Sequence, residues 1–186
     1  MPSVVDIANR ALDKVGHGSI TSLSDGTKAA NLVDRAWPIV RDQVLRSHPW
    51  NFAVTRVTTA PLSEAPAWGF TYQHELPSDC LRLLEVRDLS AGEYQVEGDR
   101  ILCDESVLYI RYIAQVTDPN TFDALFVNAV AAYLAVELCE SLTQSNSKKQ
   151  LLMEELRMVM DKTKMVDAME NPPTTFEQDD WINTRY

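Results

Sequence analysis

The chain has 186 residues, of which 45% are hydrophobic and 24% are charged, so a wholly disordered protein is excluded. Its net charge is −10, and residues 51–120 hold five basic against eleven acidic groups. This excludes the lysine- and arginine-rich stripe with which proteins grip nucleic acid tightly. We also expect no membrane insertion, because no continuous apolar run reaches the ~20 residues that span a bilayer.

The first fifty residues predict two helices. Ser3 and Asp6 have the spacing of a capping box, and apolar residues then recur at helical intervals until Gly16. A second apolar stripe predicts a helix over residues 27–47, which Pro49 stops.

The middle of the chain predicts short strands. It is rich in β-branched residues, it contains segments that alternate between apolar and polar residues, and Gly98-Asp99 has the character of a hairpin turn. The expected strands cover residues 54–59, 70–76, 81–86, 94–97, 100–103 and 107–116.

Two further helices are predicted after the strands. Asn120 is the expected cap of a helix that ends near Leu142 and is apolar around most of its circumference, as expected of a central core helix. The last helix is expected over residues 147–170, before Pro172-Pro173.

The sequence therefore predicts an α+β fold that is mainly a four-helix bundle. The bundle is discontinuous and consists of residues 1–50 and 118–170. A small antiparallel β lobe, residues 51–117, is inserted between its halves, and residues 171–186 form an extended C-terminal arm.

Residues typical of catalysis are hard to find. Cys80, Cys103 and Cys139 are far apart and are expected to be buried free thiols. Glu137 and Glu140 lie one turn apart but lack the histidine that di-metal helical sites use. We therefore predict no catalytic, cofactor-binding or metal-binding residues, although the many acids of residues 51–120 leave a hydrolase with paired carboxylates open.

Two groups of residues are candidates for binding partners. Met158, Met165 and Met169 lie on the last helix, where they form either part of the core, the commoner case, or an adaptable interface between subunits. The second group consists of large apolar residues of the arm, which need a surface to land on, either the chain's own body or another subunit. These are Phe176, Trp181, Ile182 and Tyr186.

Several segments together resemble one family, the head-to-tail adaptors of short-tailed bacteriophages, called tail tubular protein A in the best-known branch. The most specific stretch is residues 48–53, His-Pro-Trp-Asn-Phe-Ala, followed by Arg56. Other similar segments are residues 8–16, 20–25, 40–47, 72–82, 112–123 and 141–145.

The resemblance implies a structural virion protein and not an enzyme. Family members form a twelve-subunit ring beneath the portal protein, extend its DNA channel and carry the tail nozzle and often fibres, while DNA passes through without tight binding. The expected location is the head–tail junction of the virion, and the host cytoplasm during assembly. The arm would then bind the portal or a neighbouring subunit. The alternatives are a peptidoglycan hydrolase acting during phage entry, for which no residue motif can be carried over, and a monomeric cytoplasmic regulator.

Overall fold

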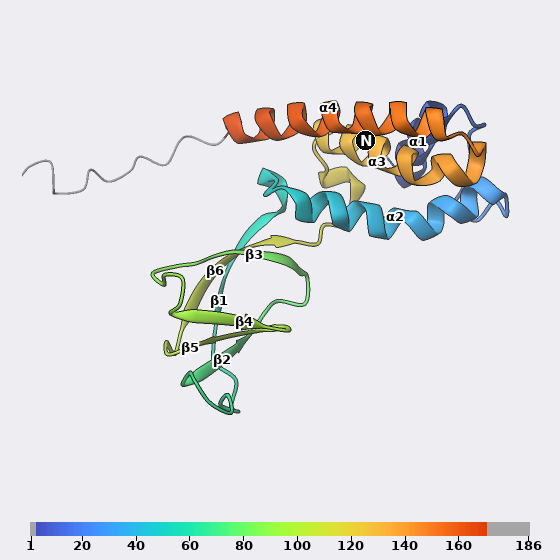
Figure 1. The fold of residues 1–186 in the computed structure, drawn as a ribbon. Coiled ribbons are helices and arrows are strands. Elements are labelled where there is room, and N and C mark those ends of the chain that lie inside the picture. Colours follow the sequence, from blue (N-terminus) through green and yellow to red (C-terminus); the bar gives the residue numbers. More distant parts are fainter. Residues whose placement is uncertain (1–2, 171–186) are drawn as a thin grey trace, which may run out of the picture.

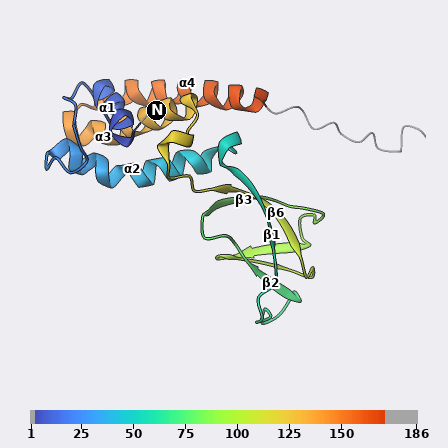
Figure 2. The ribbon, with the colours of Figure 1, turned by 180° about the vertical axis from the view of Figure 1, so that it is seen from behind.

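The structure of the protein, a computed structural model, describes residues 3–170. Within these residues it contains four α-helices and two three-stranded antiparallel sheets, so the predicted α+β class is confirmed. Figure 1 shows the helices lying side by side in one part of the molecule and the strands gathered below one end of them. Figure 2 gives the same arrangement from behind.

The third helix is the centre of the helical part. Helices α1, α2 and α4 all pack against α3, which is buried along ten of its residues. The bounds are α1 Val4–Val15, α2 Lys28–Ser47, α3 Ala124–Thr143 and α4 Asn146–Glu170.

The first helix begins and ends as its sequence predicts. The Asp6 amide donates to Ser3 Oγ at 3.1 Å, and the Ser3 amide donates to Asp6 Oδ2 at 2.8 Å, which completes the capping box. Gly16 ends the helix in the left-handed region with φ of 76°, where glycine carries no Cβ penalty. The Ser3 hydrogen bonds hold the pKa of the Asp6 carboxyl below its usual value.

The predicted cap of the third helix is wrong. Asp123, not Asn120, caps α3, and its Oδ1 accepts from the Leu125 amide at 2.7 Å. Asn120 lies one turn earlier, in the short 3-10 helix η2 Pro119–Thr121, where its own amide donates to Asp118 Oδ1. Asp118 and Asp123 therefore each cap a separate helical turn, and the carboxylate of Asp123 meets the unpaired amides that begin α3.

By length and composition, α3 is long and apolar enough to cross a membrane. This qualifies the sequence prediction, which counted only continuous apolar runs. In the structure α3 packs against three other helices, which cover most of its apolar surface. Its composition fits the core helix that the sequence predicted.

The six strands form two sheets. The first has the order β1-β6-β3 and the second the order β2-β5-β4, with every pair antiparallel. Predicted strands 54–59, 94–97 and 100–103 are confirmed to the residue, whereas 70–76 and 107–116 are longer than observed. The bounds are β1 Val54–Thr59, β2 Tyr72–Glu75, β3 Cys80–Val86, β4 Tyr94–Glu97, β5 Arg100–Cys103 and β6 Leu108–Ala114.

The sheets have a small core of their own. Seven buried residues form it, namely Val86, Ile101, Cys103, Leu108, Ile110, Tyr112 and Ala114. Ile113 points the other way from its neighbours Tyr112 and Ala114 and belongs to the helical core instead. One strand, β6, thus links the two cores.

Candidate functional site

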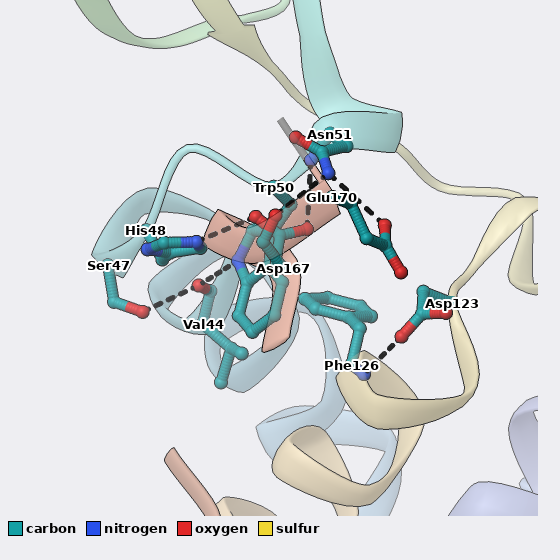
Figure 3. A network of polar contacts seen from close by, with 9 residues as sticks. All are labelled: Val44, Ser47, His48, Trp50, Asn51, Asp123, Phe126, Asp167 and Glu170. Carbon is teal, nitrogen blue, oxygen red and sulfur yellow. Dashed lines mark hydrogen bonds and ion pairs between the residues drawn. The ribbon is translucent and has the colours of Figure 1, made fainter. Parts of the chain in front are cut away.

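Residues 48–53, the most specific stretch of the resemblance, join the helices to the sheets, and we call them the junction segment. They follow the last residue of α2, include the short 3-10 helix η1 Asn51–Ala53, and lead directly into β1. Figure 3 shows that this segment also meets the last turn of α4. Three parts of the chain therefore converge on it.

Trp50 anchors the junction segment in the helical core. Its side chain is 0% exposed, and its indole Nε1 donates to the Val44 carbonyl at 2.8 Å (Figure 3). That carbonyl lies in the last turn of α2, whose final carbonyls lack partners within the helix. The tryptophan therefore fills core volume and also caps the helix that precedes it.

Aromatic rings pack around Trp50. Its ring meets Phe126 of α3 edge-on with centroids 5.1 Å apart, and Phe52 meets Phe126 at 5.0 Å. Phe122 completes the group at 4.9 Å from Phe126. Because such edge-to-face pairs are directional, they fix the angle at which the chain leaves α2 for β1.

Polar groups bind the junction segment to the end of α4. His48 Nε2 lies 2.7 Å from Asp167 Oδ2, and the Asn51 amide donates to Asp167 Oδ1 at 3.2 Å. The Asn51 side chain donates to the Asp167 carbonyl at 3.1 Å and to Glu170 Oε2 at 3.3 Å. Asp167 is buried, so these hydrogen bonds replace the water that its carboxylate gave up on folding.

A groove of about 290 Å³ opens beside this contact. Its lining combines phenyl rings with carboxylate and amide groups. It lies at Glu170, where the described part of the chain ends. The lining residues are Asn51, Phe52, Thr121, Phe122, Asp123, Leu125, Asp167 and Glu170.

The methionines of the last helix lie outside the core. Met158, Met165 and Met169 are between 55% and 72% exposed, so the commoner interpretation, core packing, is wrong for them. Leu151 is also exposed, and its spacing of seven residues from Met158 and fourteen from Met165 places it on the same side of α4. We call these four residues the α4 stripe.

The arm residues predicted to bind a partner, Phe176, Trp181, Ile182 and Tyr186, lie outside the described residues. Of the other tryptophans, Trp37 is buried, whereas Trp68 is 82% exposed.

The cysteines and the acid pair that the sequence analysis considered lie apart from one another in ordinary surroundings. Cys103 and Cys139 are buried and Cys80 is half-buried, all three without a disulfide, and burial raises the pKa of the Cys80 and Cys103 thiols. Glu137 and Glu140 are exposed, and Lys149 pairs with Glu140 at 2.6 Å and lowers its pKa. Within residues 3–170, no cluster of three potential metal ligands is present.

Sequence reasoning missed a positively charged surface on the first sheet. Cross-strand register places Arg56 of β1 opposite Arg111 of β6, and Arg111 opposite Glu85 of β3. Arg87 lies just beyond, its guanidinium 6.0 Å from the centre of the Tyr109 ring. We call these five residues the arginine face. Strand alternation could have placed each residue on a side of its strand, but not paired three distant strands.

Comparison with models of known protein families gives no match, and comparison with curated proteins gives none either. The function of this chain must therefore be inferred from its residues and their geometry.

Proposed function

We propose that this chain is the head-to-tail adaptor of a short-tailed bacteriophage. The observation that carries the proposal is the junction segment. The stretch that most closely resembles the adaptor family, His48-Pro49-Trp50-Asn51-Phe52-Ala53, is also the stretch that holds α2, α4 and β1 together. If a family shares this division into helices and an inserted sheet lobe, we expect its most specific motif at the segment that joins the two parts.

In this proposal the fold is a four-helix bundle of residues 1–50 and 118–170. The β insert, residues 51–117, and the C-terminal arm, residues 171–186, both leave the bundle at the junction segment. Support comes from the central position of α3 and from the contact between Asn51 and Glu170 at the last described turn.

The subunits are proposed to form a twelve-membered ring through the helices. The α4 stripe and the exposed Ile39 of α2 lie on helices that flank α3 from opposite sides (Figure 1). Two different faces of one chain, the α4 stripe and the surface around Ile39, permit a head-to-tail contact, and such contacts close into rings when the rotation is right. Met158, Met165 and Met169 are the proposed centre of this interface, because methionine adapts its shape to a partner.

The ring is proposed to sit beneath the portal protein, with the sheets directed at the tail nozzle and, in some members of the family, at tail fibres. Phe176, Trp181, Ile182 and Tyr186 are proposed to bind the portal or a neighbouring subunit in the virion. Before assembly the chain would be in the host cytoplasm. We propose a structural role without catalysis, in which DNA passes through the ring without tight binding.

A matched pair of variants tests the ring. Met158→Glu places a charge in the α4 stripe, and Gln150→Glu adds the same charge at an exposed polar position of α4. A buried unpaired charge is costly at an interface, so Met158→Glu should reduce binding to portal rings at least about tenfold. Gln150→Glu should bind as the unchanged chain does. Sedimentation of each variant with portal rings measures this, and equal binding by both would refute the α4 stripe as the interface.

A further inference from the structure

The arginine face lacks enough acid to balance it. Arg111 lies 3.0 Å from Glu85, so this pair is neutral. Among the described residues, the one acid paired with Arg87 is Asp88, at 3.4 Å, in a solvent-exposed pair that contributes little. Arg56 forms no ion pair with any residue of the described chain. In a protein of net charge −10, this is a local surplus of exposed guanidinium groups.

The same face offers shape as well as charge. A shallow depression of about 520 Å³ runs across β1, β6 and β3, with the half-exposed Tyr109 ring and the three guanidinium groups in its lining. Guanidinium groups bind carboxylates through paired hydrogen bonds, and both they and tyrosine stack on aromatic rings. The matching ligand is thus an acidic peptide that also carries an aromatic residue.

The chain itself contains such a peptide. Residues 176–182 read Phe-Glu-Gln-Asp-Asp-Trp-Ile, with three carboxylates, no basic group and two aromatic rings. Their charge is opposite to that of the arginine face. Opposite charges on two parts of one molecule attract most strongly at low salt.

The arm begins close enough to reach this face. Glu170 contacts Asn51, which lies five residues before Arg56 along the chain. The Cα atoms of Asn51 and Arg56 are therefore at most ~17 Å apart. Arg87, two strands further across the sheet, is then within ~25 Å. Asp179 follows Glu170 by nine residues, which span about 28 Å even at the shorter rise of a proline-rich segment. Measured from Asn51, the segment is therefore long enough to approach Arg56 and Arg87, and the long arginine side chains help to span the step between Glu170 and Asn51.

We propose that, in the free subunit, residues 176–182 dock on the arginine face of the same chain. Asp179 and Asp180 pair with Arg56 and Arg87, and Trp181 packs beside Tyr109. The linkage raises the effective concentration of the segment into the millimolar range, so weak contacts suffice. Under the proposed adaptor function, this docking would keep the large apolar side chains of the arm covered until a subunit meets its assembly partner. The docking concerns the free chain alone and stands or falls independently of the ring.

The test follows the indole N–H signal of Trp181 in the full-length chain by NMR, assigned with Trp181→Phe. The reference is a synthetic peptide of residues 174–186. At low salt the signal of the chain should be displaced from that of the peptide. The displacement should be lost in Arg56→Glu/Arg87→Glu and in 0.5 M NaCl, and should be kept in Arg35→Glu/Arg157→Glu, which changes two exposed arginines elsewhere by the same charge.

Three results would overturn the proposal. The first is a low-salt signal that coincides with that of the peptide. The second is a displacement that survives in Arg56→Glu/Arg87→Glu, which would place the arm elsewhere. The third is a displacement that grows with protein concentration, which would show that a second copy supplies the segment. Restoration of the displacement by adding Asp179→Lys/Asp180→Lys to the arginine variant would establish the charge pairing directly.

Discussion

The helices and the sheets of this molecule are held together in different ways. The helical core surrounds α3 on several sides, and capped ends such as those at Ser3 and Asp123 satisfy the backbone. The sheets share seven buried residues, and most of β1 is exposed. Because buried apolar area is the main source of stability, we infer that the helices contribute more to the stability of the fold than the sheets do.

The junction segment should respond to mutation as part of the helical core. Trp50→Ala removes a fully buried ring and leaves the Val44 carbonyl without its indole donor. We expect a loss of about 3–5 kcal/mol in the free energy of unfolding, measured with urea. Trp68→Ala, at an 82% exposed position, should change it by less than about 0.5 kcal/mol. Similar values for the two variants would contradict the anchoring role of Trp50.

The polar contact between the junction segment and α4 should also contribute to the stability of the helical part. Asp167→Ala removes the acceptor of His48 and of the Asn51 amide, which we expect to cost about 1–3 kcal/mol. Amide exchange in the last turn of α4 should quicken, because this contact fastens it to the junction segment. Asp161→Ala, exposed on the same helix, is the control. If exchange in that turn stays unchanged, the hydrogen bonds seen in Figure 3 do not fasten α4.

Alkaline pH should weaken the sheets through Tyr112. Burial, reinforced by its hydrogen bond to Asp79, raises the pKa of Tyr112 to about 12, above the ordinary value of ~10 for an unfolded chain. The folded state therefore keeps the phenol proton longer. This contribution to stability is complete below pH 10 and is lost as the pH rises through 12, an effect on the order of 2–3 kcal/mol.

The matching variant is Tyr112→Phe, which has no phenol to titrate. Urea midpoints at pH 9 and pH 11 should fall further in the unchanged chain than in the variant. Equal falls in both would show that Tyr112 does not ionise late.

The overall acidity of the chain and its local arginine face predict opposite behaviour toward DNA. With a net charge of −10, we expect duplex DNA to bind no more tightly than the micromolar range at low salt. Fluorescence anisotropy of a labelled duplex measures this. Nanomolar, salt-sensitive binding that Arg56→Glu abolishes would show that the local face outweighs the net charge.

Local signals in the sequence predicted the elements well. The Ser3–Asp6 capping box, Gly16 and the hairpin around Gly98 all act over a few residues, and the elements that they delimit lie where predicted. The sequence pattern points to Asn120 as a cap, whereas the two capping residues are Asp118 and Asp123, which lie on either side of it. Propensity alone does not decide among neighbouring caps.

Long-range relations could not be predicted in the same way. The contact between His48 and Asp167 joins residues 119 apart, and the arginine face joins three strands whose order does not follow the sequence. The exposure of Met158 also depends on which side of α4 meets α3, which a mixed apolar pattern leaves open. Such features follow from packing and not from local propensity.

The most direct test of the central claim is a count of subunits on portal rings. The full-length chain would be mixed with purified portal rings, and the complexes would be imaged by cryo-electron microscopy. We predict twelve copies beneath each portal, with the α4 stripe of each copy against α2 of its neighbour and the sheets pointing away from the portal. A chain that remains a single subunit in the presence of portal rings would contradict the adaptor function.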